Sequence, residues 1–153
     1  MNNKKIFALL LLFSACAFSN IFAQQKTRLN HIALSVHDLK KSTLFYQEFL
    51  ELDTIPEPFH DGRHTWFSIG DVAHLHLIQN PGDIITPSKN THLCFSVASV
   101  TAFAEKLAKA KISFEDWPGV KGAITTRVDK VKQLYFQDPD GYWIEVNDDH
   151  PKQ

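Results

Sequence analysis

Four side chains that can bind a metal ion occupy corresponding positions in two similar stretches of the sequence. NHIALSV at 30–36 matches THLCFSV at 91–97, and this alignment pairs His31 with His92. A later match, between AHLHLIQ from Ala73 and YWIEVND from Tyr142, places His76 opposite Glu145. Imidazole and carboxylate ligands without a thiolate suit Ni²⁺, Co²⁺, Zn²⁺, Mn²⁺ or Fe²⁺. We therefore predict one divalent metal ion bound by His31, His76, His92 and Glu145, with the choice of metal left open.

Strand alternation places these donors on the face opposite their apolar neighbours. His76 lies between Leu75 and Leu77, so its side chain points to the opposite face of the strand. Glu145 also lies between two aliphatic residues, and a carboxylate in such a position faces water or a stabilising partner. His74 shares the face of His76 and could be the ligand instead; we prefer His76 because it is the repeat partner of Glu145. We expect the other histidines to be surface residues: His37, His60, His64 and His150.

Four further residues are candidates for substrate binding. Trp143 shares the strand face of Glu145, and Cys94 lies two positions past His92 on the same face. Arg127 and Lys121 belong to a long loop at 117–129, where they could hold an anionic group. Ordinary packing would explain Cys94, and a solvated basic stretch would explain Arg127 and Lys121 equally well.

The elements that must position these residues follow a repeated order. Each copy has a strand, then a helix, then three strands, which predicts an α+β fold of two βαβββ modules forming a cupped mixed sheet. Module one covers 29–80 and module two 91–148, and the segment between them contains two prolines and a glycine. We expect helices at 39–50 and 100–110, and strands at 30–36, 64–69, 73–79, 91–97, 112–116, 131–137 and 142–147, with an irregular edge strand at 54–59.

Length and charge limit the classes of function. The 153 residues are enough for one domain with its own core, and the net charge of −1 argues against nucleic acid as a partner. The sequence contains only two cysteines, Cys16 and Cys94. If the first 23 residues are removed, an internal disulfide framework and a cysteine-based zinc site are both excluded.

The N-terminal residues are typical of a secretory signal peptide. Lys4 and Lys5 precede an apolar run at 6–18, and Ala23 is a small residue at a cleavage point. We predict a signal peptide at 1–23 and an exported single domain at 24–153, periplasmic or secreted. The apolar run is short for a membrane span, which needs about 20 residues, so we expect no stable span after cleavage. An uncleaved anchor and a lipoprotein attached through Cys16 are the alternatives.

The paired modules, the helix that begins DLKKSTLFYQEFL and the ending QDPDGYWIEV resemble the vicinal oxygen chelate superfamily. That superfamily includes glyoxalase I, fosfomycin and bleomycin resistance proteins, and extradiol dioxygenases. The resemblance covers 29–148 and implies metal ligands on the first and last strands of each module, which are again His31, His76, His92 and Glu145. Within the superfamily, the sequence most resembles bacterial glyoxalase I, in which a carboxylate ligand of the metal moves a proton. This resemblance implies that Glu145 is both a metal ligand and the base. The position of His76 is usually glutamate in glyoxalase I.

The resemblance implies a metal-dependent lyase or isomerase acting on a small substrate that is chelated through two adjacent oxygens. One alternative is a binding protein without catalysis, as in bleomycin resistance. A further alternative is ring cleavage by an Fe²⁺ extradiol-type dioxygenase. Because modules of this family can exchange between chains, we expect a homodimer, and the four ligands could come from one chain or half from each.

Overall fold

The structure is a computed structural model that describes residues 26–82 and 87–150. The predicted signal peptide, with Cys16, lies outside these residues. Among the helices that are described, none is both long enough and apolar enough to span a membrane. The elements are β1 (His31–Val36), α2 (Leu39–Leu50), β2 (Thr54–Ile55), β3 (His64–Ile69), β4 (Ala73–Gln79), β5 (His92–Ser96), α3 (Val100–Lys109), β6 (Phe114–Glu115), β7 (Thr125–Thr126), β8 (Lys132–Gln137) and β9 (Trp143–Asn147).

The two modules have the same topology, which confirms the predicted α+β fold. The first sheet has the order β1-β4-β3-β2 and the second β5-β9-β8-β6, with the short strand β7 paired to β8. In each sheet the first and last long strands, β1 with β4 and β5 with β9, run parallel, whereas the other pairs are antiparallel. The predicted ends of the helices and long strands lie within about two residues of the observed ends. The predicted ranges of β2 and β6 are longer than the observed strands, and β7 was not predicted.

Local sequence explains where the helices begin and end. Asp38 caps α2 by accepting a hydrogen bond from the Lys41 amide at 2.9 Å, and Ser99 does the same for α3. Glu51, after α2, adopts a left-handed conformation with a φ of 55°, which ends the helix.

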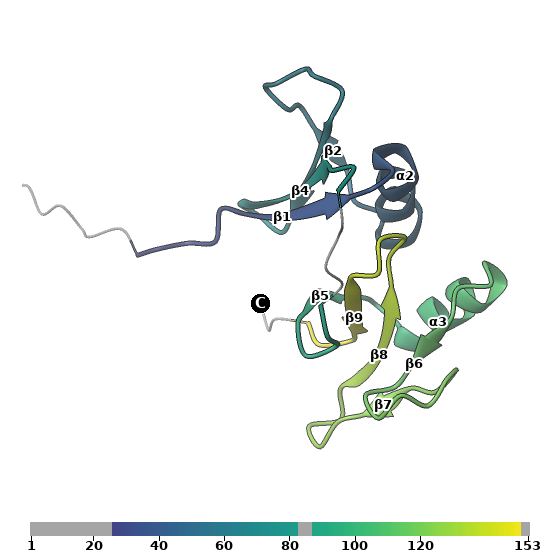
Figure 1. The fold of residues 1–153 in the computed structure, drawn as a ribbon. Coiled ribbons are helices and arrows are strands. Elements are labelled where there is room, and N and C mark those ends of the chain that lie inside the picture. The colour runs from purple at the N-terminus through teal and green to yellow at the C-terminus, as the bar shows by residue number, and fades with distance from the viewer. Residues whose placement is uncertain (1–25, 83–86, 151–153) are drawn as a thin grey trace, which may run out of the picture.

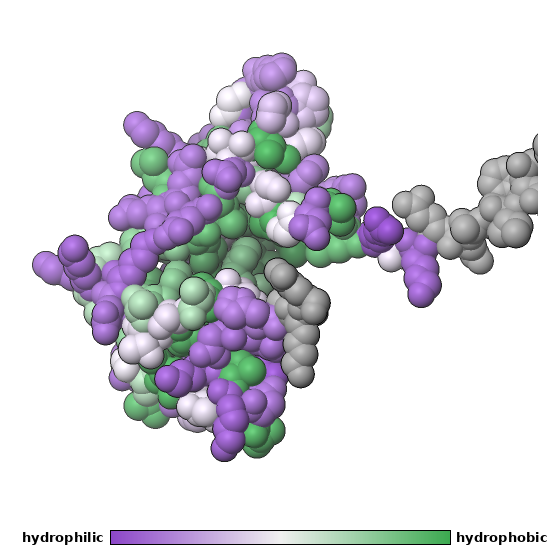
Figure 2. All heavy atoms as spheres, turned by 180° about the vertical axis from the view of Figure 1, so that it is seen from behind, coloured by the Kyte–Doolittle hydropathy of each residue, from purple (hydrophilic) through white to green (hydrophobic). Residues whose placement is uncertain are grey.

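The described strands form two separate sheets in one chain, where the sequence predicted a single cupped sheet. Figure 1 shows the first module above the second, with α2 next to the turn that joins β8 and β9. Phe136 on β8 joins the modules, since its ring centroid is 6.1 Å from that of Phe45 on α2 and 5.6 Å from that of Phe103 on α3. Figure 2 shows hydrophobic residues at the bottom of the hollow between the two modules.

Polar contacts also connect α2 to the turn after β8. The hydroxyl of Tyr46 donates to Oδ2 of Asp138 at 2.8 Å, and that of Ser42 donates to Oδ2 of Asp140 at 2.5 Å. The backbone N–H of His37 donates to Oδ1 of Asp140 at 2.8 Å. In the sequence, DPDG indicates only a tight turn. The structure shows that its two aspartates also hold the first module against the second.

Tyr46 should make the protein sensitive to alkaline pH. Burial, followed by the charge of Asp138, raises the pKa of Tyr46 well above its usual value. A pKa that is higher in the folded state stabilises the protein below about pH 10, and this contribution falls as the unfolded chain ionises above pH 10. We expect the free energy of unfolding of the wild-type protein to fall more steeply above pH 10 than that of Tyr46→Phe.

Urea titrations at pH 7 and at several values above 10 would measure the difference between the two proteins. At pH 7 we expect Tyr46→Phe to be about 1.5–3 kcal/mol less stable, because it loses a hydrogen bond to a buried carboxylate. The difference in free energy of unfolding between the two proteins should narrow with rising pH. The remaining tyrosines titrate in both proteins and therefore do not contribute to this change. Parallel pH profiles would contradict the assignment.

Candidate metal centre

The first module brings two of the predicted ligands together. Because β1 and β4 are parallel with Ala33 opposite His76, His31 lies diagonally across from His76. Their imidazole rings are stacked, with centroids 4.4 Å apart and an interplanar angle of 7°. Nδ1 of His31 donates to Oδ1 of Asn30 at 2.7 Å, which leaves its Nε2 free as a ligand.

His76 is the more enclosed of these two histidines. Its exposed fraction is 8%, and no described residue is a hydrogen-bond partner of its buried Nε2. The indole of Trp66 lies flat on its other side, with centroids 3.9 Å apart and an interplanar angle of 2°. Burial, followed by neighbouring His31, lowers the pKa of His76, so the neutral form is favoured. Neutral imidazole is the form that binds metals.

The second module pairs His92 with Glu145 in the same diagonal relationship, with Cys94 opposite Glu145 across the parallel strands. Nδ1 of His92 lies 2.7 Å from the carbonyl oxygen of Lys89. A carbonyl only accepts, so Nδ1 of His92 carries a proton, and Nε2 is the ring nitrogen that faces Glu145. Nε2 of His92 is 3.3 Å from Oε2 of Glu145. These two atoms are close enough to share a proton or a metal ion.

Glu145 is only 6% exposed and is surrounded by hydrogen-bond donors. The hydroxyl of Tyr135 donates to Oε2 at 2.5 Å, and the side-chain amide of Asn147 donates to Oε1 at 2.9 Å. The thiol of Cys94 lies 3.3 Å from Oε1. Burial by itself raises the pKa of Glu145, but these hydrogen bonds outweigh it and lower the pKa overall. The carboxylate is therefore ionised near neutral pH.

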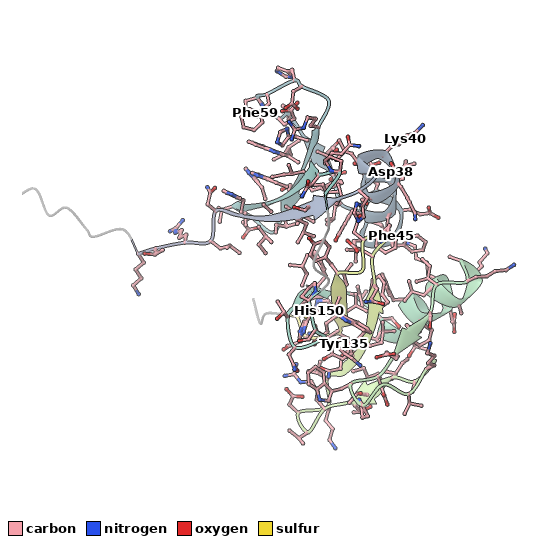
Figure 3. All side chains as sticks on the ribbon, viewed as in Figure 1. Asp38, Lys40, Phe45, Phe59, Tyr135 and His150 are labelled. Carbon is pink, nitrogen blue, oxygen red and sulfur yellow. The ribbon has the colours of Figure 1, made fainter. Side chains whose placement is uncertain are left out.

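The residues predicted to bind substrate differ in their surroundings. Cys94 is exposed as a residue, but desolvation of its thiol by neighbouring atoms, followed by the charge of Glu145, raises the pKa of the thiol to about 12, so it is a donor and not a thiolate nucleophile. Arg127 forms an ion pair with Asp129 at 2.6 Å. Lys121 and Trp143 line one pocket of about 250 Å³ together with Tyr135. Figure 3 shows Tyr135 on β8, in the second module.

One chain does not bring all four predicted ligands together. Within residues 26–82 and 87–150, no group of three or more His, Cys, Asp or Glu side chains is placed to hold a metal ion. The structure instead gives two pairs, His31 with His76 and His92 with Glu145, one on each sheet. The two pairs occupy equivalent register positions, because β1 with β4 repeats the pairing of β5 with β9.

Each pair nevertheless has features that suit a metal ligand. Nε2 of His76 is a buried ring nitrogen with no described hydrogen-bond partner, and His31 and His92 are each oriented through Nδ1 by an oxygen. Histidines that bind metals usually donate their other ring N–H to such an oxygen. These three imidazoles with the Glu145 carboxylate therefore fit a divalent metal ion.

Three supporting residues are missing from the sequence-based prediction. Tyr135 lies directly opposite Glu145 in the β8–β9 hairpin, Asn147 is two residues beyond Glu145 on the same face, and Lys89 provides the carbonyl for His92. Counting back from the DPDG turn could have paired Tyr135 with Glu145. No signal in the sequence points to Lys89, because its contact with His92 uses the backbone carbonyl. Its side-chain ammonium is held elsewhere, by Glu115 and two loop carbonyls.

The choice between His74 and His76 can be tested by mutation. We expect His76→Ala to weaken metal binding by at least about tenfold, because it removes a ligand with its orphaned nitrogen. His74→Ala is the matched control on the same strand face and should leave the affinity within about twofold. Competition with a chelating dye would measure both. A larger loss in His74→Ala would assign the ligand to His74.

Comparison with known proteins agrees with this topology. Residues 28–146 match the family described as the Glyoxalase/Bleomycin resistance protein/Dioxygenase superfamily. A lactoylglutathione lyase of Pseudomonas putida is 27% identical over 150 residues, which cover 76% of this chain and 82% of the relative. The metallothiol transferase FosB of Staphylococcus epidermidis is 30% identical over 131 residues, which cover 79% and 81%.

Among solved structures, a glyoxalase/dioxygenase from Nostoc punctiforme superposes with a TM-score of 0.63 and 25% identity, covering 81% of this chain and 92% of that one. The match to the family extends over both modules and includes His31, His76, His92 and Glu145. The chain therefore belongs to the Glyoxalase/Bleomycin resistance protein/Dioxygenase superfamily.

Proposed function

We propose that the protein is a divalent-metal-dependent lyase or isomerase similar to glyoxalase I. The observation that supports this most strongly is the geometry of His92, whose Nε2 lies 3.3 Å from Oε2 of the Glu145 carboxylate. A bound metal ion would polarise the substrate oxygens and stabilise negative charge that develops on them. Glu145 is the carboxylate of the proposed ligand set, so it is the group we assign to proton transfer between neighbouring substrate carbons.

We further propose that the complete site requires two chains. His31 and His76 of one copy would meet His92 and Glu145 of a second copy, because one chain holds the pairs on separate sheets. The three imidazoles and the carboxylate would then provide three neutral ligands and one anionic ligand. A divalent ion would retain a net positive charge, which favours an anionic or strongly polarised substrate oxygen.

We propose that the remainder of the substrate binds on the second module. Trp143 and Tyr135 form aromatic walls of the 250 Å³ pocket, with Lys121 and Glu115 among its other lining residues. Glu115 is paired with Lys89, so Lys121 is the cation available to an anionic group. The volume suits a small substrate.

Metal analysis and activity assays test the proposed reaction. We expect the purified protein to contain about one divalent ion per site and to convert methylglyoxal in the presence of a thiol. Glutathione, cysteine and a thiol-free reaction should be compared, because an exported enzyme would not meet the cytosolic glutathione pool. Metal-free protein that cannot be loaded would favour the non-catalytic alternative. Oxygen consumption with a catechol would favour dioxygenase chemistry.

A thiol transferase is a second candidate function. It is favoured by the relative named metallothiol transferase, which at 30% identity is as similar to this chain as the lyase relative. Such an enzyme would add the sulfur of a thiol to an electrophilic carbon, and the product would be a stable thioether. Mass spectrometry separates the two reactions, since a transferase consumes the thiol permanently whereas a glyoxalase-type isomerisation gives a thioester.

Mixing two inactive variants tests whether the site is shared. A His76→Ala chain and a Glu145→Gln chain each lack one proposed ligand, the first from module one and the second from module two. If two chains build each site, a mixed dimer contains one intact site formed by the unaltered module of each chain. Activity should then return on mixing, to at most about a quarter of the wild-type value for random pairing into dimers with two sites. No recovery, with exchange of subunits demonstrated, would place the site within one chain.

A further inference from the structure

We infer that Tyr135 is a positioning residue for Glu145, and that it holds this carboxylate in the orientation needed to bind a metal ion. This inference rests on the proposed metal-dependent function. The hydroxyl of Tyr135 donates to Oε2 of Glu145, and Oε2 is the oxygen that faces Nε2 of His92. Tyr135 therefore fixes the oxygen that would share a cation with His92.

The ring of Tyr135 contacts the second ligand as well. It packs edge-on against the imidazole of His92, with centroids 5.5 Å apart and an interplanar angle of 82°. Tyr135 is only 2% exposed, so packing restricts its ring while its hydroxyl reaches the carboxylate. A single buried side chain thus restrains both ligands of the second module.

The internal repeat provides an independent argument for this role. Tyr135 on β8 lies directly across from Glu145 on β9, and Trp66 on β3 lies directly across from His76 on β4. Each residue opposite a proposed ligand is aromatic, and its chemistry suits that ligand. The flat indole of Trp66 stacks on the imidazole at 3.9 Å, whereas the phenol donates to the carboxylate. Chance packing would not predict this correspondence between aromatic residue and ligand type.

Asn147 is a second hydrogen-bond donor to Glu145, and it binds the carboxylate oxygen that Tyr135 does not. Its amide donates to Oε1 of Glu145 at 2.9 Å and lies 3.1 Å from the sulfur of Cys94. The carboxylate is thus held from both sides by β8 and β9. Loss of either donor should let Glu145 rotate out of its orientation, at a cost to metal affinity but not to the fold.

A double-mutant cycle tests this role. The probe is Ni²⁺, which imidazoles bind without a carboxylate, so that affinity remains measurable after Glu145→Gln. Tyr135→Phe should weaken Ni²⁺ binding by about 10–100-fold in the wild-type background. In the Glu145→Gln background the same change should cost less than about threefold, because the carboxylate that Tyr135 orients is gone. Tyr142→Phe is the matched control and should leave the affinity unchanged.

The outcomes distinguish this inference from the proposed function. Equal losses in both backgrounds, or no loss from Tyr135→Phe, would overturn the positioning role while the metal site stands. Wild-type protein that binds no metal would overturn the proposed function and the inference with it. Should Tyr135→Phe fail to fold by circular dichroism, Asn147→Ser carries the same cycle, with the same dependence on Glu145 expected.

Discussion

Glu145→Gln should lose both its metal ion and its activity. The substitution preserves the volume of the side chain but replaces the anionic oxygen ligand with a neutral amide. Loss of a residue that only orients a ligand typically costs 10–100-fold in affinity or activity, so loss of the ligand itself should cost at least about 100-fold in each. Because Glu145 is also the proposed base, activity should not recover when excess metal is added.

Metal content by elemental analysis and turnover at saturating metal would measure this effect. Glu105→Gln is the matched control, since Glu105 is exposed on α3. It should retain wild-type metal content and rate. A Glu145→Gln protein with normal turnover would contradict the assignment of Glu145 as base and ligand.

Phe136→Ala should be among the most destabilising single substitutions. Phe136 is 1% exposed and packs against Phe45 from α2 and Phe103 from α3. Truncation therefore opens a cavity where both helices meet the second sheet, and such changes cost about 3–5 kcal/mol. For a chain of this size the melting temperature should fall by roughly 10 °C.

Thermal and urea unfolding would measure the loss of stability. Phe59→Ala is the matched control, because Phe59 is 58% exposed, and it should change the free energy of unfolding by less than about 1 kcal/mol. If Phe136→Ala unfolds in two separate transitions where the wild-type protein unfolds in one, Phe136 is the residue that couples the unfolding of the two modules. A loss below about 1 kcal/mol would contradict the bridging role.

The sequence alone determined the two modules and which strand faces carry the candidate ligands. Alternation of apolar and polar residues has a period that depends only on local backbone geometry, so the faces of β4 and β9 could be read from Leu75, His76 and Glu145. Asp38 and Ser99 marked the helix starts for the same local reason. The internal repeat then identified which histidine corresponds to Glu145, and the register of β4 and β9 agrees with that correspondence.

Only the tertiary structure decided how the modules meet and what surrounds the ligands. Contacts such as Tyr46 with Asp138 join residues 92 positions apart, and no local pattern encodes them. The same holds for the ammonium of Lys89, which contacts Glu115 and the loop after β6, 26 to 28 positions along the chain. The separation of the two ligand pairs within one chain also depends on how α2 packs against β8. Side-chain periodicity fixes which face a ligand occupies, but the packing of one sheet relative to another depends on shape complementarity between distant residues.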